Sequence, residues 1–354
     1  MNGALDGIQV LDLTTLLPGP LATLCLAEAG ADVLKVEKPG GEDMRRYPPF
    51  VDGESVAFSI LNRGKRFLEL DLKSDSGRQE LLDLAKQADV LVEQFRPGVM
   101  ARLGLDYETL AAVNPRLILC SISGYGQEGP RAIEAGHDIN YMALTGVLDL
   151  SRGPVDAPIL PPTQVADIGG GSFPALINIL LALIARERTG RGTHLDIAMT
   201  DAMFAFAPFA HADFIGIGSV ARSGTMLLTG GSPRYGLYAT ADRHLVAVGA
   251  LEQKFWMALC EAVGLEEALR ADTNDPEATR KGLAARFAAR PAEDWKPILA
   301  KADCCATLVR AYPDALEDPH FVDRGLFDRD IELDSGTRIR ALPLPIDPAV
   351  RRSD

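Results

Sequence analysis

Apolar and polar positions along the first 125 residues predict strands and helices in alternation. Apolar runs over residues 8–14, 32–37, 67–72, 89–95 and 116–126 are typical of buried strands. Residues 20–31 and 77–88 have the spacing of helices, and the first of these has proline in its first turn and Gly30 at its end. Apolar strands that alternate with helices indicate βαβ units and a mostly parallel sheet, which binds ligands beyond the carboxyl ends of its strands.

The second half of the chain has a different pattern. Residues 173–185 form the longest apolar run, which is too short to span a bilayer and contains Asn178, so we expect a buried helix. Residues 232–250 predict a hairpin around an Ala-Asp-Arg turn. Helical segments follow to about residue 310, and a last strand is expected over 337–346. The hairpin and its helices indicate a small second domain.

Composition narrows the class of protein. A chain of 354 residues, 47% hydrophobic and 24% charged, has room for about two globular domains. The net charge of −13 argues against nucleic acid or an anionic membrane as the main partner. The five cysteines lack metal-like or redox spacing and the N-terminus has no signal-peptide pattern, so we expect a cytoplasmic protein without membrane insertion.

Basic residues gather after the predicted strands of the first half. The first strand is followed by TTLLPGP rather than GxGxxG, so a nicotinamide dinucleotide is not the expected ligand. A local basic concentration in an acidic chain favours a phosphorylated ligand, and the alternative is a solvated basic face. The residues concerned are Lys35, Lys38, Arg45, Arg46, Arg63, Lys65, Arg66 and Arg96.

Several segments together resemble a known family. They are GIQVLDLTTLLPGPLATLCLAEAGADVLKVEKPGGEDMRR, NRGKRFLELDLKS, FRPGVMARLGLDYETL, LILCSISGYGQEGP, GHDINYMALTG, ADIGGG, RTGRG and YATADRHLVAVGALEQKFW. In this order, and over almost the whole chain, they are similar to the family III CoA-transferases, and within that superfamily to the α-methylacyl-CoA racemases.

The resemblance implies a fold and a partner. It implies an α/β fold with a Rossmann-like large domain, a smaller α+β domain and an interlocked homodimer, whose active sites form between the large domain of one chain and the small domain of the other. The boundaries that we expect are 1–197 and 330–354 for the large domain, 198–231 for a linker, 232–310 for the small domain and 311–329 for a return linker.

The resemblance also implies a substrate. It implies an acyl-CoA and no metal, nicotinamide or flavin cofactor. The residues expected to bind CoA are Lys38, Arg45, Arg46, Arg63, Arg96 and Arg102.

Two glycine-containing turns carry the candidate chemistry. Epimerising the carbon beside a thioester needs one base on each face, and His137 in GHD and Asp167 in ADIGGG are such a pair. The Asp138 N–H, at the start of a predicted helix, would donate to the enolate oxygen, and the three glycines would let the backbone approach the substrate. His137 read alone is equally consistent with a cap or a packed side chain, and Asp167 with an N-cap.

The resemblance leaves two reactions open. In the racemases the residues matching His137 and Asp167 are the two bases, and the residue matching Glu252 is the partner of the histidine. In the transferases the residue matching Asp167 attacks the thioester and forms a mixed anhydride. The three residues together favour the racemase over the transferase and over a catalytically silent CoA-binding subunit.

One position departs from the racemase pattern. Arg234 in GGSPRY stands where an aromatic residue is usual. A cation in the acyl pocket would favour a polar or carboxylated acyl group, and the alternative is an arginine that turns to solvent.

Overall fold

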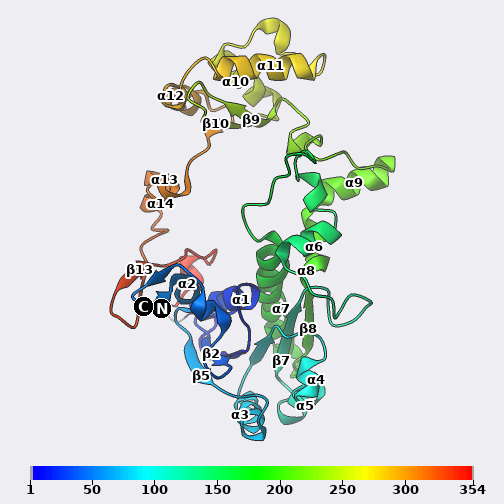
Figure 1. Cartoon of the computed structure of the whole chain (residues 1–354), viewed down its shortest axis with the longest axis vertical. Helices are drawn as coiled ribbons and strands as arrows, with labels where there is room; N and C mark the ends of the chain where they lie inside the picture. Colours follow the sequence, from blue (N-terminus) through cyan, green and yellow to red (C-terminus); the bar gives the residue numbers. More distant parts are fainter. Residues whose placement is uncertain (1–2, 353–354) are drawn as a thin grey trace. The chain divides into compact units, whose positions relative to one another are not determined.

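The computed structural model describes residues 3–352. The chain divides into two compact units (Figure 1). The first takes in Met1–Val147, Pro161–Pro208 and Val322–Asp354, and the second takes in Leu148–Leu160 and Phe209–Phe321.

A six-stranded parallel sheet forms the centre of the first unit. The strand order is β5-β2-β1-β6-β7-β8, and every neighbouring pair is parallel. This is a doubly wound order, which reverses direction between β1 and β6, and sheets of this kind bind ligands beyond the carboxyl ends of the strands at that point. The predicted α/β class with a mostly parallel sheet is therefore confirmed. The strands are β1 (Gln9–Asp12), β2 (Asp32–Glu37), β5 (Arg66–Glu69), β6 (Val90–Glu93), β7 (Ile118–Ser123) and β8 (His194–Ala198).

Helices cover both faces of this sheet. Alternate strand residues such as Leu11, Leu34 and Leu91 pack in one core with helices α3, α4 and α5, because successive side chains in a strand point to opposite faces. On the other side, α1 packs against α2 and α7, and α7 lies against β7 and β8. The helices of this unit are α1 (Pro18–Glu28), α2 (Val56–Asn62), α3 (Asp75–Ala85), α4 (Val99–Arg102), α5 (Tyr107–Val113), α6 (Asp138–Leu144), α7 (Phe173–Thr189) and α8 (Met199–Met203).

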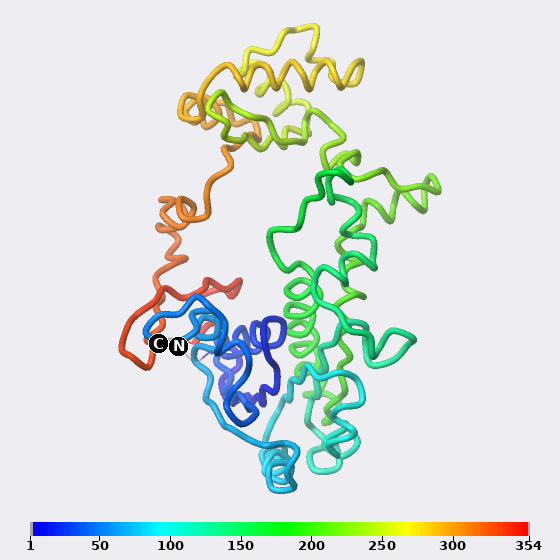
Figure 2. Tube along the Cα trace, in the orientation of Figure 1, coloured from blue at the N-terminus to red at the C-terminus, as the bar shows by residue number. Residues whose placement is uncertain are grey.

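The end of the chain returns to its beginning within the first unit. The Ala4 N–H donates to the Val350 carbonyl at 3.1 Å, and the Arg352 N–H donates to the Glu28 carbonyl at 3.1 Å. Figure 2 shows the last segment of the chain beside the first. The predicted last strand is shorter than expected: β13 (Arg338–Arg340) pairs antiparallel with β12 (Asp330–Glu332). The remaining short elements are η1 (Asp43–Arg46), β3 (Phe50–Val51), β4 (Glu54–Ser55), η4 (Phe204–Phe206) and η7 (Pro348–Val350).

The second unit has its own sheet and core. Strand β10 pairs antiparallel with β9 and β11, which confirms the predicted hairpin. The core contains Trp256, Phe287 and Trp295 from three helices, packed against Val246 of the sheet. The elements are α9 (Pro208–Ile217), β9 (Tyr235–Ala239), β10 (Leu245–Gly249), α10 (Gln253–Val263), α11 (Pro276–Phe287), α12 (Ala292–Ala302), β11 (Ala306–Leu308), α13 (Tyr312–Leu316) and α14 (Pro319–Asp323), with short 3-10 turns η2 (Leu148–Leu150), η5 (Leu227–Thr229) and η6 (Glu267–Leu269).

Helix α7 is buried on one face only. Its inner face lies on β7 and β8, and Arg186 near its end pairs with Asp89 at 2.8 Å. Its outer face exposes Ile177, Leu181 and Ile184 at 55%, 58% and 59%, so the expectation of a buried helix is wrong for that face. Within residues 3–352 one helical stretch, Ala166–Thr189, is long and apolar enough to cross a membrane by length and composition.

Candidate active site

The first candidate turn lies at the start of α6. His137 is the N-cap, with an extended backbone (φ −128°, ψ 174°), and its side chain is exposed. The Asn140 carboxamide oxygen accepts the His137 N–H at 3.0 Å. Asp138 is the first helical residue, and the structure gives its N–H no acceptor among residues 3–352. A first-turn N–H without a partner is free to donate to a ligand oxygen.

The buried side chain of Tyr141 holds this turn in place. Its hydroxyl donates to the Gly136 carbonyl at 2.6 Å, and its ring meets that of Tyr125 edge-on at 5.3 Å. A Cβ on Gly124 or Gly136 would lie 2.6 or 2.7 Å from the Tyr141 ring, so both positions require glycine. Burial, followed by the charge of Asp167, raises the pKa of Tyr141 to about 12, so the hydroxyl remains a donor. The residue before His137 is thereby held in place.

The second candidate turn is a π-helix, η3 (Ala166–Ser172), which continues into α7. Its three glycines pack against protein atoms: a Cβ would lie 2.4 Å from the Phe206 ring at Gly169, 2.5 Å from the Met199 carbonyl at Gly170 and 2.9 Å from the Pro18 side chain at Gly171. Protein atoms therefore fill the side of each glycine on which a Cβ would lie, and the approach of this backbone to the substrate stays a prediction. Their small size lets η3 pack closely against α1 and α8.

The Asp138 carboxylate joins the two turns. Its Oδ1 accepts the N–H groups of Ala166 and Asp167 at 2.6 and 3.0 Å. These are the first N–H groups of η3, which have no acceptor within that helix. One oxygen atom of Asp138 thus binds two residues that lie 28 and 29 positions further along the chain. Sequence analysis assigned only the backbone of residue 138 and missed this contact.

Asp167 has an unusual proton affinity. Its side chain is half-buried, and burial together with the neighbouring Asp138 charge raises its pKa from 3.8 to about 6, an effect that His137 partly offsets. His137, Asp138 and Asp167 therefore lie within electrostatic reach of one another. A carboxyl group with a pKa near working pH can both accept and release a proton.

Lys35 and Lys65, two of the basic residues that follow the predicted strands, have a structural role. Lys35 and Lys65 are buried with Asp12, and Lys65 Nζ lies 3.0 Å from the Asp12 carboxylate. Lys35 Nζ also pairs with Glu42 at 3.2 Å. Including these two lysines in a ligand-binding cluster was wrong, because their charges neutralise buried carboxylates that hold the loop after β1.

The remaining basic residues near β2 differ in how firmly they are engaged. Arg45 donates to both Glu37 carboxylate oxygens and lies 3.8 Å from the centre of the Phe58 ring. Arg63 is 12% exposed and pairs with Glu28 at 3.5 Å. Both line a groove of about 1190 Å³ in the first unit.

Lys38 and Arg46 share one carboxylate at the surface. They contact Asp43 at 2.9 and 3.2 Å, and they are 58% and 63% exposed. Exposed pairs of this kind contribute about 0–1 kcal/mol, so a phosphate can compete for these two cations.

Arg96 and Arg102 follow β6, at the switch point of the sheet. Both are exposed, and neither has a carboxylate within ion-pair distance among residues 3–352. The positive charge of Arg96 lowers the pKa of Tyr141, although burial and the nearby Asp167 raise that pKa by more. Arg96 therefore lies near the His137 turn. Its loop is shaped by buried Glu93, which accepts the Phe95 N–H at 2.7 Å and whose pKa burial raises to about 7.

Glu252 belongs to the second unit. It is exposed and is the N-cap of α10. Its neighbours are held by Arg234, which donates to the Leu251 carbonyl at 3.0 Å and to the Gln253 side chain at 2.9 Å. Arg234 also binds Asp272 through two nitrogens, so its charge is neutralised within the unit rather than turned to solvent.

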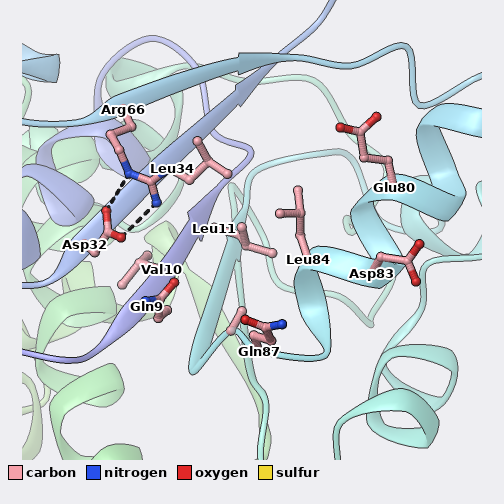
Figure 3. Close-up of a pocket in the computed structure, with 11 residues that line it drawn as sticks. Gln9, Val10, Leu11, Asp32, Leu34, Arg66, Glu80, Asp83, Leu84 and Gln87 are labelled. Atoms are coloured by element: carbon pink, nitrogen blue, oxygen red, sulfur yellow. Dashed lines mark hydrogen bonds and ion pairs between the residues drawn. The ribbon is translucent and has the colours of Figure 1, made fainter.

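A separate hollow lies at the amino-terminal ends of the strands (Figure 3). It has a volume of about 280 Å³ and is lined by Gln9, Asp32 and Arg66, the first residues of three strands. Arg66 and Asp32 form a two-point ion pair at 2.8 Å. Because doubly wound sheets bind ligands at the carboxyl ends of their strands, this hollow is not the candidate site.

Comparison with known proteins agrees with this picture of an α/β enzyme. The chain belongs to the CoA-transferase family III, whose model matches residues 5–350. It is 37% identical over 355 residues to alpha-methylacyl-CoA racemase of Homo sapiens, covering 99% of this chain and 89% of that protein. It is also 39% identical over 342 residues to succinyl-CoA:mesaconate CoA-transferase of Haloarcula hispanica, covering 91% and 84% of the two chains. Among solved structures, a CAIB/BAIF family protein from Brucella suis is similar with a TM-score of 0.85 and 31% identity, covering 98% of this chain and 93% of that one.

Proposed function

We propose that the protein epimerises 2-methylacyl-CoA thioesters by two-base proton transfer at C2. One epimer presents its C2–H to the Asp167 carboxylate, which takes the proton. The electron pair moves onto the thioester oxygen as an enolate, which accepts a hydrogen bond from the Asp138 N–H. Protonated His137 then returns a proton to C2 from the opposite face. The other epimer follows the same path in reverse, with His137 as base and Asp167 as acid.

The observation that carries this proposal is the half-buried Asp167, whose pKa is raised to about 6 beside His137. An acid/base group must hold both protonation states near neutral pH, and each such group contributes about 10²–10⁴ in rate. A nucleophilic carboxylate, in contrast, acts only in its ionised state. The similarity to the human racemase supports the same reaction.

CoA transfer is the second candidate, because the chain is also 39% identical to the mesaconate CoA-transferase. In that reaction Asp167 attacks the thioester carbonyl, the C–S bond breaks, CoA thiolate leaves and an aspartyl anhydride remains for an acceptor carboxylate. Incubation of 2-methylacyl-CoA with the protein in D₂O separates the two reactions. The racemase introduces deuterium at C2 without acceptor acid. Product formation that requires an acceptor, with a hydroxylamine-trapped Asp167, would establish the transferase instead.

The proposed CoA-binding residues fall into an order. Arg96 and Arg102 have no competing carboxylate among residues 3–352, Lys38 and Arg46 have a weak surface competitor, and Arg45 and Arg63 are held by Glu37 and Glu28. All six remain part of the proposal, and Arg96 is expected to contribute most.

Arg96→Ala should raise KM for acyl-CoA about tenfold with a smaller change in kcat, because binding of the remote nucleotide is largely uniform along the reaction. Arg188→Ala, an exposed arginine on α7, is the matched control and should leave KM unchanged. Equal KM values in the Arg96 variant and the control would remove Arg96 from the CoA site.

We also propose that the protein is a homodimer and that Glu252 orients the His137 imidazole. The exposed stripe of Ile177, Leu181 and Ile184 on α7 supports a partner chain, because a row of large apolar side chains is costly to leave in water. Sedimentation velocity should give a dimer, and Leu181→Glu should shift it to monomer. A monomer at micromolar wild-type concentration would contradict the dimer.

A further inference from the structure

The N-terminus of η3 depends on a side chain from elsewhere in the sequence. Val165, its own N-cap, provides no side-chain cap, and the backbone there is already helical (φ −68°, ψ −42°). The cap comes instead from Asp138, 28 positions earlier, through hydrogen bonds of 2.6 and 3.0 Å. One carboxylate oxygen therefore fixes where the helix that carries Asp167 begins.

The same residue forms part of the other turn. Asp138 follows His137 directly and opens α6, so its main chain belongs to one turn and its side chain to the other. Two acid/base groups on opposite faces of one carbon must keep a fixed spacing to within about 0.5 Å. A single residue that binds both turns can hold that spacing.

The charge of Asp138 also reaches Asp167. Asp138, His137 and Tyr141 lie on or beside α6 and are the titratable groups that interact with Asp167. Pro18 of α1 and Met199 of α8 pack against the glycines of η3, and Asp201, the charged residue of α8, is exposed. Asp196 of β8 accepts the Gln127 N–H at 2.9 Å. A like charge beside a carboxyl group disfavours its ionisation.

We propose that the Asp138 side chain is a positioning residue for the proposed reaction: its carboxylate locks the Asp167 turn to the His137 turn, and its negative charge acts on Asp167. This inference rests on the proposed function for its significance, but both of its parts are physical properties of the unliganded protein. They can be measured whether or not the protein is a racemase.

Two substitutions separate the two parts. Asp138→Asn keeps an acceptor oxygen of similar shape but removes the charge, whereas Asp138→Ala removes both. Both variants keep the residue 138 N–H. Asp201→Asn is the matched control, because Asp201 is an exposed carboxylate on α8 beside η3.

The experiment follows the Asp167 carboxyl by ¹³C NMR during a pH titration, with the signal assigned by Asp167→Asn. In Asp138→Asn the midpoint should fall by about one pH unit, and in Asp201→Asn it should stay at the wild-type value. If substrate turnover is observed, the acidic limb of the kcat/KM profile should move with the midpoint. A midpoint in Asp138→Asn equal to that of wild type would overturn the charge part.

Amide hydrogen exchange tests the lock. The Ala166 and Asp167 amides should stay protected in Asp138→Asn and should exchange at least about tenfold faster in Asp138→Ala, because only the alanine variant lacks their acceptor. Unchanged protection in Asp138→Ala would overturn the lock. If the variants show both effects but the wild-type protein incorporates no deuterium into 2-methylacyl-CoA, the racemase proposal is refuted and this inference stands.

Discussion

His137 is exposed at the N-terminus of the short helix α6, whereas Asp167 is half-buried in the π-helix η3 that leads into the 17-residue helix α7. In the first turn, the Asn140 side chain accepts the His137 N–H and the Tyr141 hydroxyl donates to the Gly136 carbonyl. The second is held by close packing of three glycines. A histidine can serve as a base in water, but a carboxyl group must be partly withdrawn from water before it holds a proton near neutral pH. The different construction of the two turns matches the different surroundings that the two proposed bases would need.

The largest expected effect is on catalysis at the exposed turn. His137→Ala should lower epimerisation by about 10²–10⁴, because one of the two bases is lost. Stability should change by no more than about 0.5 kcal/mol, since the side chain is exposed. Chiral analysis of the acyl-CoA and thermal unfolding measure the two quantities. A large loss of stability would mean that this turn is built like the buried one.

The buried turn should respond to added volume. Gly170→Ala places a Cβ 2.5 Å from the Met199 carbonyl, and overpacking of this kind costs about 1–3 kcal/mol. Gly216→Ala on α9 is the control, because no atom lies within 4 Å of its Cβ. The control should be neutral or stabilising by up to about 1 kcal/mol. Equal free energies of unfolding for the two variants would contradict the tight packing of η3.

The raised pKa of Asp167 predicts that the fold is less stable when this carboxyl group is ionised. The folded protein holds the Asp167 proton more tightly than the unfolded chain, so ionisation destabilises the fold as pH rises from about 4 to about 6. Asp167→Asn should then be more stable than wild type at pH 7 by about 1–2 kcal/mol, after allowance for partial solvent screening. The difference should vanish below pH 4. Urea unfolding at the two pH values tests this, and an equal difference at both would argue against a raised pKa.

Tyr141→Phe should have the smallest effect. It removes the hydrogen bond to the Gly136 carbonyl, which contributes about 1 kcal/mol. Proton exchange served by His137 should slow more than exchange served by Asp167, because the lost bond holds the residue before His137. Tyr312→Phe, at a position that is 70% exposed, should change neither quantity. Equal slowing of both exchanges would assign Tyr141 to the general stability of the fold.

The sheet was predictable because its strands are short continuous apolar runs. Strand β8 and helix α2 are not predicted: His194 and Asp196 of β8 are exposed, and α2 is only a 7-residue segment. The outer face of α7 was expected to be buried because an apolar run alone does not tell which of its side chains pack inside the chain.

The candidate turns were predictable from local residues, but their connection was not. The contact between Asp138 and the Asp167 turn spans 28 positions and has no sequence signal. The pairing of Arg63 with Glu28 is likewise long-range. By contrast, Asp43 lies in the same short segment as Lys38 and Arg46, and this proximity in sequence was an available sign that their charges are partly neutralised.

The measurement that tests the two-base account most directly is exchange at C2 in D₂O, followed separately for each epimer in two single variants. In Asp167→Asn, His137 can still remove a proton and return a deuteron on its own face, so one epimer should exchange slowly without inversion and the other should not. In His137→Ala only the opposite epimer should exchange. Full epimerisation in Asp167→Asn, or equal exchange of both epimers in both variants, would contradict the account.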